Sequence, residues 1–598
     1  MKKCKTIGKL LLVGWVMING SFLMAQNPIK IANAEVKPLN FIKMTDPVRD
    51  IVTSHDGVVV RPPRIGYHPK SDWPLNEKTN PNALPLGIDP ALQKSYAPSN
   101  NAERVLLRHW EGIGADGDFS PGDPSVDVGP NHVVQMVNGV GGSNVQIWDK
   151  NGNSLTAFIF DGVTTISGGG DPIVLYDQLA DRWLLSEFAA FGNTLIIAIS
   201  TSPDPTGSYF IYSFNTPNFP DYPKYGIWNN SYIVTTNEAN SRIYALDRTK
   251  MLAGDQSATA QQFNISDFGT LGVFQTATPV NFNGITLPPV GAPGMFMRIA
   301  DDGWTGVSQD RLEIYEMSID FNNAANSSIT GPFNLATLPF DTGINGYTAF
   351  SGIPQPGTTV SLDPLREVLM NKIYYRNFGS YESLVCNHVT DVTGNDDAGI
   401  RWYELRRYGG INGSWFIYQQ GTYSPDNTSR WMGSIAINDN GAIGLMYNVS
   451  NATNVFPGIR YTGRDLGDPL GQMTYPESLL LGGAFASASN RWGDYSTLSV
   501  DPVDGTFWGT AQYVPNSINW GTRVVNIEIP SNCPPNNVIN ATVSSSEINY
   551  ARNRVILQAS SIANGADPTF TGAFQTQITG NFQCPIGAGF NITLTGCN

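Results

Sequence analysis

Charge is the scarcest property of this chain. Charged residues make up 14 % of its 598 residues, whereas soluble globular domains carry about 25 %. Long amphipathic helices depend on Lys, Glu and Arg, which are sparse here. The 50 Asp and Glu residues outnumber the 36 Lys and Arg residues, so the net charge is −14. Because phosphate binding requires clustered Lys and Arg, nucleic acid is excluded as a partner.

Motifs for metal and acyl-transfer chemistry are also missing. The five histidines show none of the spacings of a zinc site. No Gly-x-Ser-x-Gly turn of a serine hydrolase occurs either. Beyond the first 25 residues, no apolar run approaches the roughly 20 residues that span a bilayer. The sequence therefore argues against transition-metal catalysis, against a serine esterase and against a transmembrane segment.

The first 25 residues have the pattern of a cleavable signal peptide. A basic start with four lysines precedes a short apolar stretch at 10–18 and a small-residue site that ends at Ala25. A lipid anchor would need a cysteine at the cleavage point, where Gln26 stands instead. We therefore expect cleavage near Ala25 and a mature protein that is secreted or held at the cell surface.

Glycine, proline and aromatic residues are abundant where charge is not. The chain holds 61 Gly and 40 Pro, and 11 % of its residues are aromatic, a composition that suits turns and packed strands and predicts an all-β protein. Prolines crowd residues 26–104 and leave few backbone donors for a sheet. This segment is predicted to be an extended arm that lies against the next domain or is partly disordered, with a cleaved propeptide as the alternative.

From residue 105 to 529 one pattern recurs. Alternating apolar positions lead to an Asp or Asn turn and then to a second apolar strand, most clearly at 430–447 and 491–508. The spacing of the copies is near the roughly 40 to 50 residues of propeller blades. The pattern predicts a β-propeller of about seven blades (six to eight), because radial closure hides strand edges that cannot stand alone. A pair of β-sandwiches is the alternative.

Residues 530–598 predict a small C-terminal β module of short apolar runs. Cys533, Cys584 and Cys597 lie here, and an exported protein can form one disulfide among them, whose pairing stays open. The run at 554–562 and those that follow it resemble the coat-hanger-like β modules that end some secreted bacterial proteins. That resemblance implies an accessory or surface-anchoring element.

Two turns resemble the Asp-box hairpins of sialidase-type propellers. The segments 499–508 and 202–210 follow the Ser-x-Asp-x-Gly-x-x-Trp pattern with small departures. In that family the box is structural, since the Asp caps the turn and the aromatic ring packs beneath it. The signatures Tyr-Arg-Asn-Phe-Gly, Arg-Trp-Tyr-Glu-Leu-Arg and Arg-Trp-Gly-Asp-Tyr at 370–510 also resemble those of secreted bacterial β-propeller proteins, a likeness that implies no activity.

The resemblance to sialidases also implies a type of active site. Sialidases grip a carboxylate with three arginines beside an acidic group. The catalytic candidates here are Arg401, Glu404, Arg430, Arg491 and Asp494. Because the Arg-Trp pair recurs in successive copies, packing of the arginine stem on the tryptophan ring between blades is the simpler interpretation.

One Gly-rich loop offers ligands for a hard cation. Asp116, Asp118 and Asp123 place three carboxylates within eight residues, and Ca²⁺ prefers such oxygen ligands. The loop lacks the glutamate and the spacing of an EF-hand. Bound calcium is therefore the cofactor to be tested.

Two functions remain open at this stage. The first is a secreted propeller that binds carbohydrate or a cell-surface partner without catalysis, with aromatic side chains as stacking platforms on one face. The alternative is a glycoside hydrolase or lyase of the sialidase-like propeller type. The sequence leaves the ligand, the oligomeric state and any anchoring role of the C-terminal module undecided.

Overall fold

The computed structural model describes residues 28–32, 34–51, 80–94, 105–117, 120–238, 241–266, 276–347, 350–516, 519–529 and parts of 536–593. Within these residues the chain is almost entirely β. The helical elements are α1 (Phe160–Thr164), α2 (Arg248–Leu252), η1 (Val48–Asp50), η2 (Ala324–Asn326), η3 (Ile344–Tyr347) and η4 (Gly410–Asn412). None of the helices described has the length and apolarity needed to cross a membrane.

The strands between Val105 and Glu528 pair in successive antiparallel groups of four. The first group is β5 (Ser125–Val128), β6 (His132–Gly139), β7 (Gly142–Asp149) and β8 (Ser154–Ile159). The second is β9 (Gly168–Asp177), β10 (Arg182–Ala189), β11 (Thr194–Ser200) and β12 (Tyr209–Asn215). The third is β13 (Asp221–Ile227), β14 (Ser231–Asn237), β15 (Ser241–Asp247) and β16 (Thr259–Asn264).

The next two groups are linked by a parallel pairing of their first strands, β17 and β21. The fourth group is β17 (Thr278–Phe282), β18 (Gly294–Ala300), β19 (Arg311–Ser318) and β20 (Ser328–Ala336). The fifth is β21 (Ile373–Asn377), β22 (Glu382–Asp391), β23 (Ala398–Arg407) and β24 (Phe416–Tyr423).

The last two groups complete the series. The sixth is β25 (Ser429–Ile437), β26 (Ile443–Ser450), β27 (Gly458–Arg464) and β28 (Tyr475–Leu481). The seventh is β29 (Thr497–Val500), β30 (Phe507–Tyr513), β31 (Gly521–Glu528) and β4 (Val105–Glu111). Its outer strand, β4, thus comes from before the first group in the sequence.

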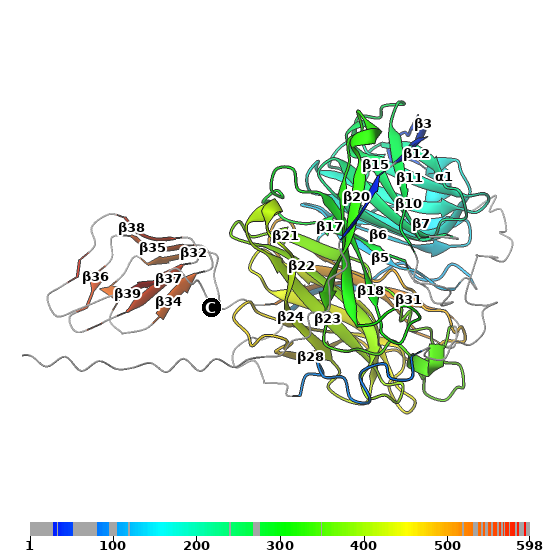
Figure 1. Ribbon diagram of the computed structural model, residues 1–598. Helices are drawn as coiled ribbons and strands as arrows, with labels where there is room; N and C mark the ends of the chain where they lie inside the picture. Colours follow the sequence, from blue (N-terminus) through cyan, green and yellow to red (C-terminus); the bar gives the residue numbers. More distant parts are fainter. Residues whose placement is uncertain are drawn as a thin grey trace, which may run out of the picture.

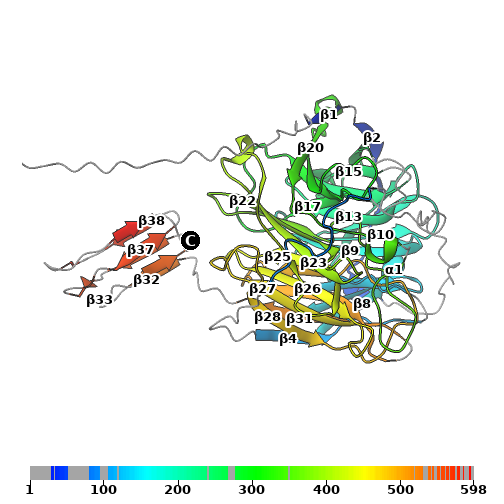
Figure 2. The same cartoon turned by 60° about the horizontal axis from the view of Figure 1, so that its bottom comes forward.

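The groups form a closed ring. The first strand of each group contacts the first strand of the next, and β29 of the last group contacts β5 of the first. Figure 2 shows β4, blue because it comes early in the sequence, beside the late strand β31. This arrangement is a β-propeller and confirms the expected propeller fold over a pair of sandwiches.

Apolar side chains fill the spaces between neighbouring blades. At the closure, Trp110 of β4 lies between Trp148 of the first blade and Trp508 of the last, with ring centroids 5.9 and 5.6 Å apart. Valines from both blades surround Trp148 and Trp508, both of which are buried. The closing strand therefore carries part of the hydrophobic contact between the first and last blades.

Both Asp-box turns make the contacts expected of a structural element. In the seventh blade the Trp508 indole donates to Asp501 at 3.0 Å, and Asp504 accepts from the backbone and hydroxyl of Thr506. In the second blade Asp204 accepts hydrogen bonds from the backbone N–H and the hydroxyl of Thr206. These carboxylates hold hairpin turns.

The described parts of the N-terminal arm lie on the propeller. Strands β1 (Ile29–Ala32), β2 (Glu35–Pro38) and β3 (Asn40–Met44) pair with the outer strands β20, β16 and β12. The prolines of the arm suggested too few donors for a sheet. An outermost strand needs donors on only one side, and Pro38 and Pro47 fall at or beyond strand ends, so the pairing is compatible with them.

The C-terminal strands are built differently. Their bounds are β32 (Asn536–Ile539), β33 (Thr542–Val543), β34 (Ile548–Ala551), β35 (Arg554–Gln558), β36 (Ser561–Ile562), β37 (Thr569–Gly572), β38 (Gln575–Thr579) and β39 (Asn591–Thr593). All their pairings are parallel, in the orders β32-β35-β38, β33-β36 and β34-β37-β39. They form a short parallel stack, drawn as a separate group in Figure 1.

Several expectations concern residues outside those described. The signal peptide at 1–25 is one, and the disulfide is another, because Cys533 and Cys597 lie outside the described residues. The cleavage site and the disulfide pairing therefore stay predictions.

Replacing Trp110 by Ala tests the ring closure. We expect the variant to lose about 2 to 3 kcal/mol of stability, because the ring links Trp148 and Trp508 across the closure. Urea unfolding followed by tryptophan fluorescence and circular dichroism measures the change. Leu107→Ala on the same strand is the matched control, since Leu107 is 37 % exposed. Equal unfolding midpoints for the two variants would contradict this role of Trp110.

Candidate functional site

Polar residues gather where the first strands of four blades begin. Asp123 precedes β5, Asp171 lies in the first part of β9, Asp221 opens β13 and Asp494 precedes β29. The first strands surround the axis and run in the same direction, so their starting ends meet at one end of it. We call the following residues the mouth cluster: Asp123, Asp171, Asp221, Asp494, Tyr222, Lys224, Arg491 and Tyr495.

Hydrogen bonds join the members of this cluster that come from different blades. The amide side chain of Asn138 donates to Asp123 and accepts from the backbone N–H of Asp171 at 2.9 Å. The backbone N–H of Asp494 donates to Asp123 at 3.2 Å. The hydroxyl of Tyr495 donates to Asp171 at 2.8 Å. The first, second and seventh blades are thus tied together at the mouth.

Two features of the backbone show how closely the chain is packed at the mouth. A Cβ atom on Gly493 would lie 2.8 Å from Pro124 and 3.1 Å from the backbone nitrogen of Asp123, so only glycine allows this approach. Asp123, Asp171 and Tyr222 have φ values of 44°, 54° and 50°, in the region that favours glycine. Such conformations cost about 1 to 3 kcal/mol each and collect at functional sites.

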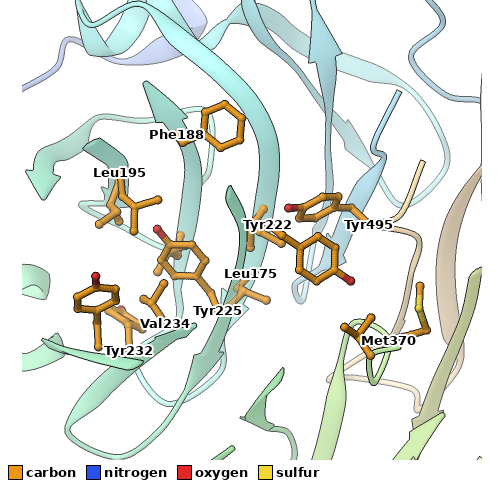
Figure 3. Close-up of a cluster of buried hydrophobic side chains, with 14 of the residues drawn as sticks. Leu175, Phe188, Leu195, Tyr222, Tyr225, Tyr232, Val234, Met370 and Tyr495 are labelled. Atoms are coloured by element: carbon orange, nitrogen blue, oxygen red, sulfur yellow. The ribbon is translucent and has the colours of Figure 1, made fainter. Parts of the chain in front are cut away.

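Lys224 lies buried among the carboxylates. Its ammonium stands 3.1 Å from the ring centroid of Tyr495 and 3.8 Å from that of Tyr222, and it donates to the backbone carbonyl of Asp494 at 3.4 Å. Figure 3 shows the two tyrosine rings next to each other at the edge of the apolar core. The rings shield the lysine from water and stabilise its positive charge through their faces.

Burial shifts the ionisation of the cluster toward neutral pH. Loss of hydration, helped by the charge of Asp171, raises the pKa of Asp221 to about 7. It raises the pKa of Asp494 to about 6, although Lys224 and Arg491 oppose this change. Burial also lowers the pKa of Lys224 to about 7, against the pull of the surrounding carboxylates. Since these groups interact, they titrate together rather than one by one.

Two members of the cluster reach the solvent. Asp221 is partly exposed, and the side chain of Arg491 is 25 % exposed. The Arg491 guanidinium lies 3.9 Å from the carboxylate of Asp494 and 4.8 Å from the ring centroid of Phe350. Asp221 accepts a hydrogen bond from Asn237 at 3.0 Å. The rim of the mouth therefore offers a carboxylate, a guanidinium and an aromatic ring.

The structure separates the predicted catalytic residues. Arg491 and Asp494 belong to the mouth cluster. Arg401 is buried against Asp89 of the N-terminal arm, with its Nη2 2.5 Å from the carboxylate, and Glu404 accepts from Arg406 at 2.6 Å. The first ion pair joins the arm to β23, and the second lies within β23.

Arg430 is held elsewhere in the sixth blade. Its guanidinium contacts Glu477 at 2.8 Å and Asp426 at 2.9 Å. The arginines at 401, 430 and 491 thus face different carboxylates rather than one shared ligand position. Arg401 also lies 5.8 Å from the ring centroid of Phe340, and Arg430 lies 5.9 Å from that of Tyr423. The carboxylate partners are required because a buried guanidinium needs a paired charge.

The predicted calcium loop is divided as well. Asp123 belongs to the mouth cluster, whereas the exposed Asp116 accepts from the backbone of Val140 and from Asn144. Asp118 lies outside the described residues. Calcium binding by this loop stays a prediction.

A different set of carboxylates lies close enough to share one cation. Asp301, Asp302 and Asp310, in the loop between β18 and β19, have oxygens within 4.8 Å of one another. Burial raises the pKa of Asp301 to about 6 and that of Asp310 to about 8. Asp301 already accepts from the backbone and hydroxyl of Thr342, and Asp310 from the backbone of Phe340. These bonds account for the position of the carboxylates within the loop.

Sequence reasoning named three of the eight residues of the mouth cluster and missed the other five, although a signal was present. Asp123 and Asp171 each stand directly before a proline, in or just before the first strand of a blade. The dipeptide Asp221-Tyr222 recurs as Asp494-Tyr495 at the start of another copy. The two Asp-Pro and two Asp-Tyr pairs, each near the first strand of a blade, were the signal for these four acids.

The raised pKa of Asp221 predicts a pH-dependent effect on stability. The folded protein keeps the proton up to about pH 7, whereas the unfolded chain releases it near 3.8, so stability falls as pH rises between these values. We expect Asp221→Asn to raise the melting temperature by about 1 to 3 °C at pH 8 and to change it little below about pH 4. Calorimetry at both pH values measures this, and an effect of equal size at both would refute the assignment.

Comparisons with known proteins add little to this picture. No protein-family model matches the chain, and no curated protein matches it. Among solved structures, the WD40 domain of SCAP from fission yeast is 9 % identical over 70 % of this chain and 98 % of its own, with a TM-score of 0.32. An exo-β-1,3-galactanase from Phanerochaete chrysosporium is 12 % identical over 57 % of this chain and 80 % of its own, with a TM-score of 0.24. A protein of unknown function from Dyadobacter fermentans is 11 % identical over 71 % of this chain and 99 % of its own, with a TM-score of 0.28. Scores this low support no argument, so the propeller assignment rests on the strand pairings.

Proposed function

We propose that the mouth cluster binds a carbohydrate and that this binding is the function of the propeller. The observation that carries the proposal is the rim itself, where the partly exposed Arg491 lies against Phe350 and near the partly exposed Asp221. Sugar hydroxyls donate to carboxylates and accept from a guanidinium, while their C–H faces stack on an aromatic ring. One rim thus offers all three contacts to a single ligand.

The excess of carboxylates at the mouth limits which sugars it can bind. Four carboxylates face two cations in the cluster, and Lys224 is buried beneath the tyrosine rings. A carboxylate-bearing sugar such as a sialic acid would meet repulsion rather than an arginine triad. The proposal is therefore a neutral or amino sugar. The proposal includes export directed by the segment that ends at Ala25, because the protein would encounter polysaccharides outside the cell.

Glycan binding by Asp221→Asn tests this proposal. At pH 8, where Asp221 is ionised, we expect the variant to bind at least tenfold more weakly, because a hydrogen bond to a charged group is worth about 1.5 to 3 kcal/mol. A glycan array identifies the ligand, and calorimetric titration with the best oligosaccharide measures the affinity. Asp439→Asn is the matched control, since Asp439 is exposed at the opposite end of β25. Equal affinity for the two variants would exclude the mouth as the binding site.

A second candidate function is cleavage of a glycosidic bond. Its specific support is the pair of carboxyl groups with raised pKa, Asp221 and Asp494, beside further carboxylates. A glycosidase needs a protonated acid close to an ionised carboxylate at working pH, and burial of this kind provides it.

The pH profile distinguishes cleavage from binding alone. If Asp221 is the general acid, hydrolysis of aryl glycosides falls as pH rises through about 7, because the acid loses its proton there. Asp221→Asn and Asp494→Asn should each lower the rate about 10²-fold or more, with Glu404→Gln as the control in a structural ion pair. Failure of the wild-type protein to cleave any glycoside, despite binding the sugar, leaves the binding function and removes the enzymatic one.

A further inference from the structure

The N-terminal arm passes around the outside of the ring in two runs. The first run, 29–51, pairs with the outer strands of the fourth, third and second blades through β1, β2 and β3, in that order. It ends at η1, which lies against β8 of the first blade. Figure 2 shows the beginning of this run, with β1 beside β20. The first run therefore crosses four successive blades.

The second run, 80–94, starts again at the fourth blade and passes around the ring in the opposite sense. The side chain of Asn80 donates to a backbone carbonyl in the loop between β18 and β19. Leu92 forms a bridge to β24, the outer strand of the fifth blade, and Gln93 contacts the loop between β27 and β28 of the sixth. The chain then becomes β4, the outer strand of the seventh blade. Together the two runs contact every blade.

Buried side chains anchor the first run. Leu39 and Val48 are 2 % and 0 % exposed. Leu39 packs in a core cluster with residues of the second and third blades, and Val48 packs with residues of the first and second. The hydroxyl of Thr45 accepts from the backbone N–H of Tyr209 at 2.9 Å. The arm thus contributes to the hydrophobic core of the propeller rather than resting on its surface.

A buried ion pair anchors the second run. The Nη2 atom of Arg401, in β23, lies 2.5 Å from the carboxylate of Asp89, and neither side chain is exposed to solvent. The hydroxyl of Thr422 donates to the same carboxylate at 2.8 Å. Among the described residues, Asp89 is the only carboxylate within 4.0 Å of this guanidinium. The propeller therefore contains a buried cation whose counter-ion is supplied by the arm.

Backbone groups hold the second run on both sides of Leu92. The backbone N–H of Thr422 donates to the carbonyl of Ala91 at 2.8 Å, and that of Gln93 donates to the carbonyl of Thr422 at 2.9 Å. The side chain of Gln93 donates to the carbonyl of Met473 at 3.0 Å and accepts from its N–H at 2.9 Å. Separating the arm from the blades would leave these donors and acceptors without their partners.

We infer that the N-terminal arm is a permanent belt around the ring, which a break in the chain between the arm and β4 does not release. Loss of the arm would leave Arg401 as a buried, unpaired charge and would uncover the outer edges of the second, third and fourth blades. A propeptide that is shed after cleavage would have to break all of these contacts together. The inference is independent of the proposed function, because the contacts named here involve no residue of the mouth cluster.

Cleavage of the chain beyond the second run tests the inference. A glycine-serine linker that contains the recognition site of a specific protease is inserted in the full chain between Lys94 and Val105. After digestion, gel filtration in native buffer should give one peak that contains both fragments, and the two should separate only in concentrated urea. Separation of the arm from the propeller in native buffer would overturn the inference.

Variants of the second run show whether the contacts described here retain the arm. In the cut protein, placed in urea below its unfolding midpoint, Asp89→Asn should release the arm at least about tenfold faster, because disrupting a buried charge pair speeds dissociation. Gln93→Ala should also speed release and leaves no charge unpaired, so it serves if Asp89→Asn prevents folding. Asp46→Asn is the matched control, since Asp46 is an exposed acid of the same arm. An arm that leaves both test variants no faster than it leaves this control contradicts the belt.

Discussion

Closure of the ring is the constraint on which the rest of the structure depends. Each blade is a small antiparallel sheet, and four strands alone leave edges and apolar faces that water would reach. Pairing of β4 with β31 completes the last blade with a strand from before the first, and Trp110 fills the space between the two. Only a closed ring brings Asp123 and Asp494, 371 residues apart, within one hydrogen bond. The mouth exists because the two ends of the repeat array are joined.

Buried charge on the axis follows from the same closure. Lys372 of the fifth blade lies 2.8 Å from Asp127 of the first and 3.0 Å from the hydroxyl of Ser499 in the seventh. Removing such charges from water is costly, and only accurate geometry offsets the cost. A ring held at both ends provides that geometry. The same rigidity supports the strained backbone of Asp171 and Tyr222, which an open sheet would relax.

The sequence predicted the fold because the repeat is local. Alternating apolar residues and acidic turns specify each hairpin, as the contacts of Asp501 and Trp508 show, and the number of copies follows from their spacing. What the sequence could not show was which residues meet across blades. Arg401 and Arg430 looked equivalent to Arg491 by motif, yet their partners, Asp89 and Glu477, come from segments whose proximity only the folded chain defines. The edge pairing of β1 to β3 was hidden likewise, because local proline content says nothing about which side of a strand needs donors.

Scarcity of charge makes the mouth exceptional in this chain. With 14 % charged residues, the buried ion pairs described elsewhere hold the segments of the chain together, as Arg401 of β23 and Asp89 of the N-terminal arm do. At the mouth the numbers of acidic and basic groups are unequal, since four carboxyl groups lie near two cations. Burial raises the pKa values of Asp221 and Asp494 there. Buried carboxyl groups whose pKa values are shifted in this way are candidates for a functional site. Closure of the ring therefore brings together both the blades and the residues that we propose bind a ligand.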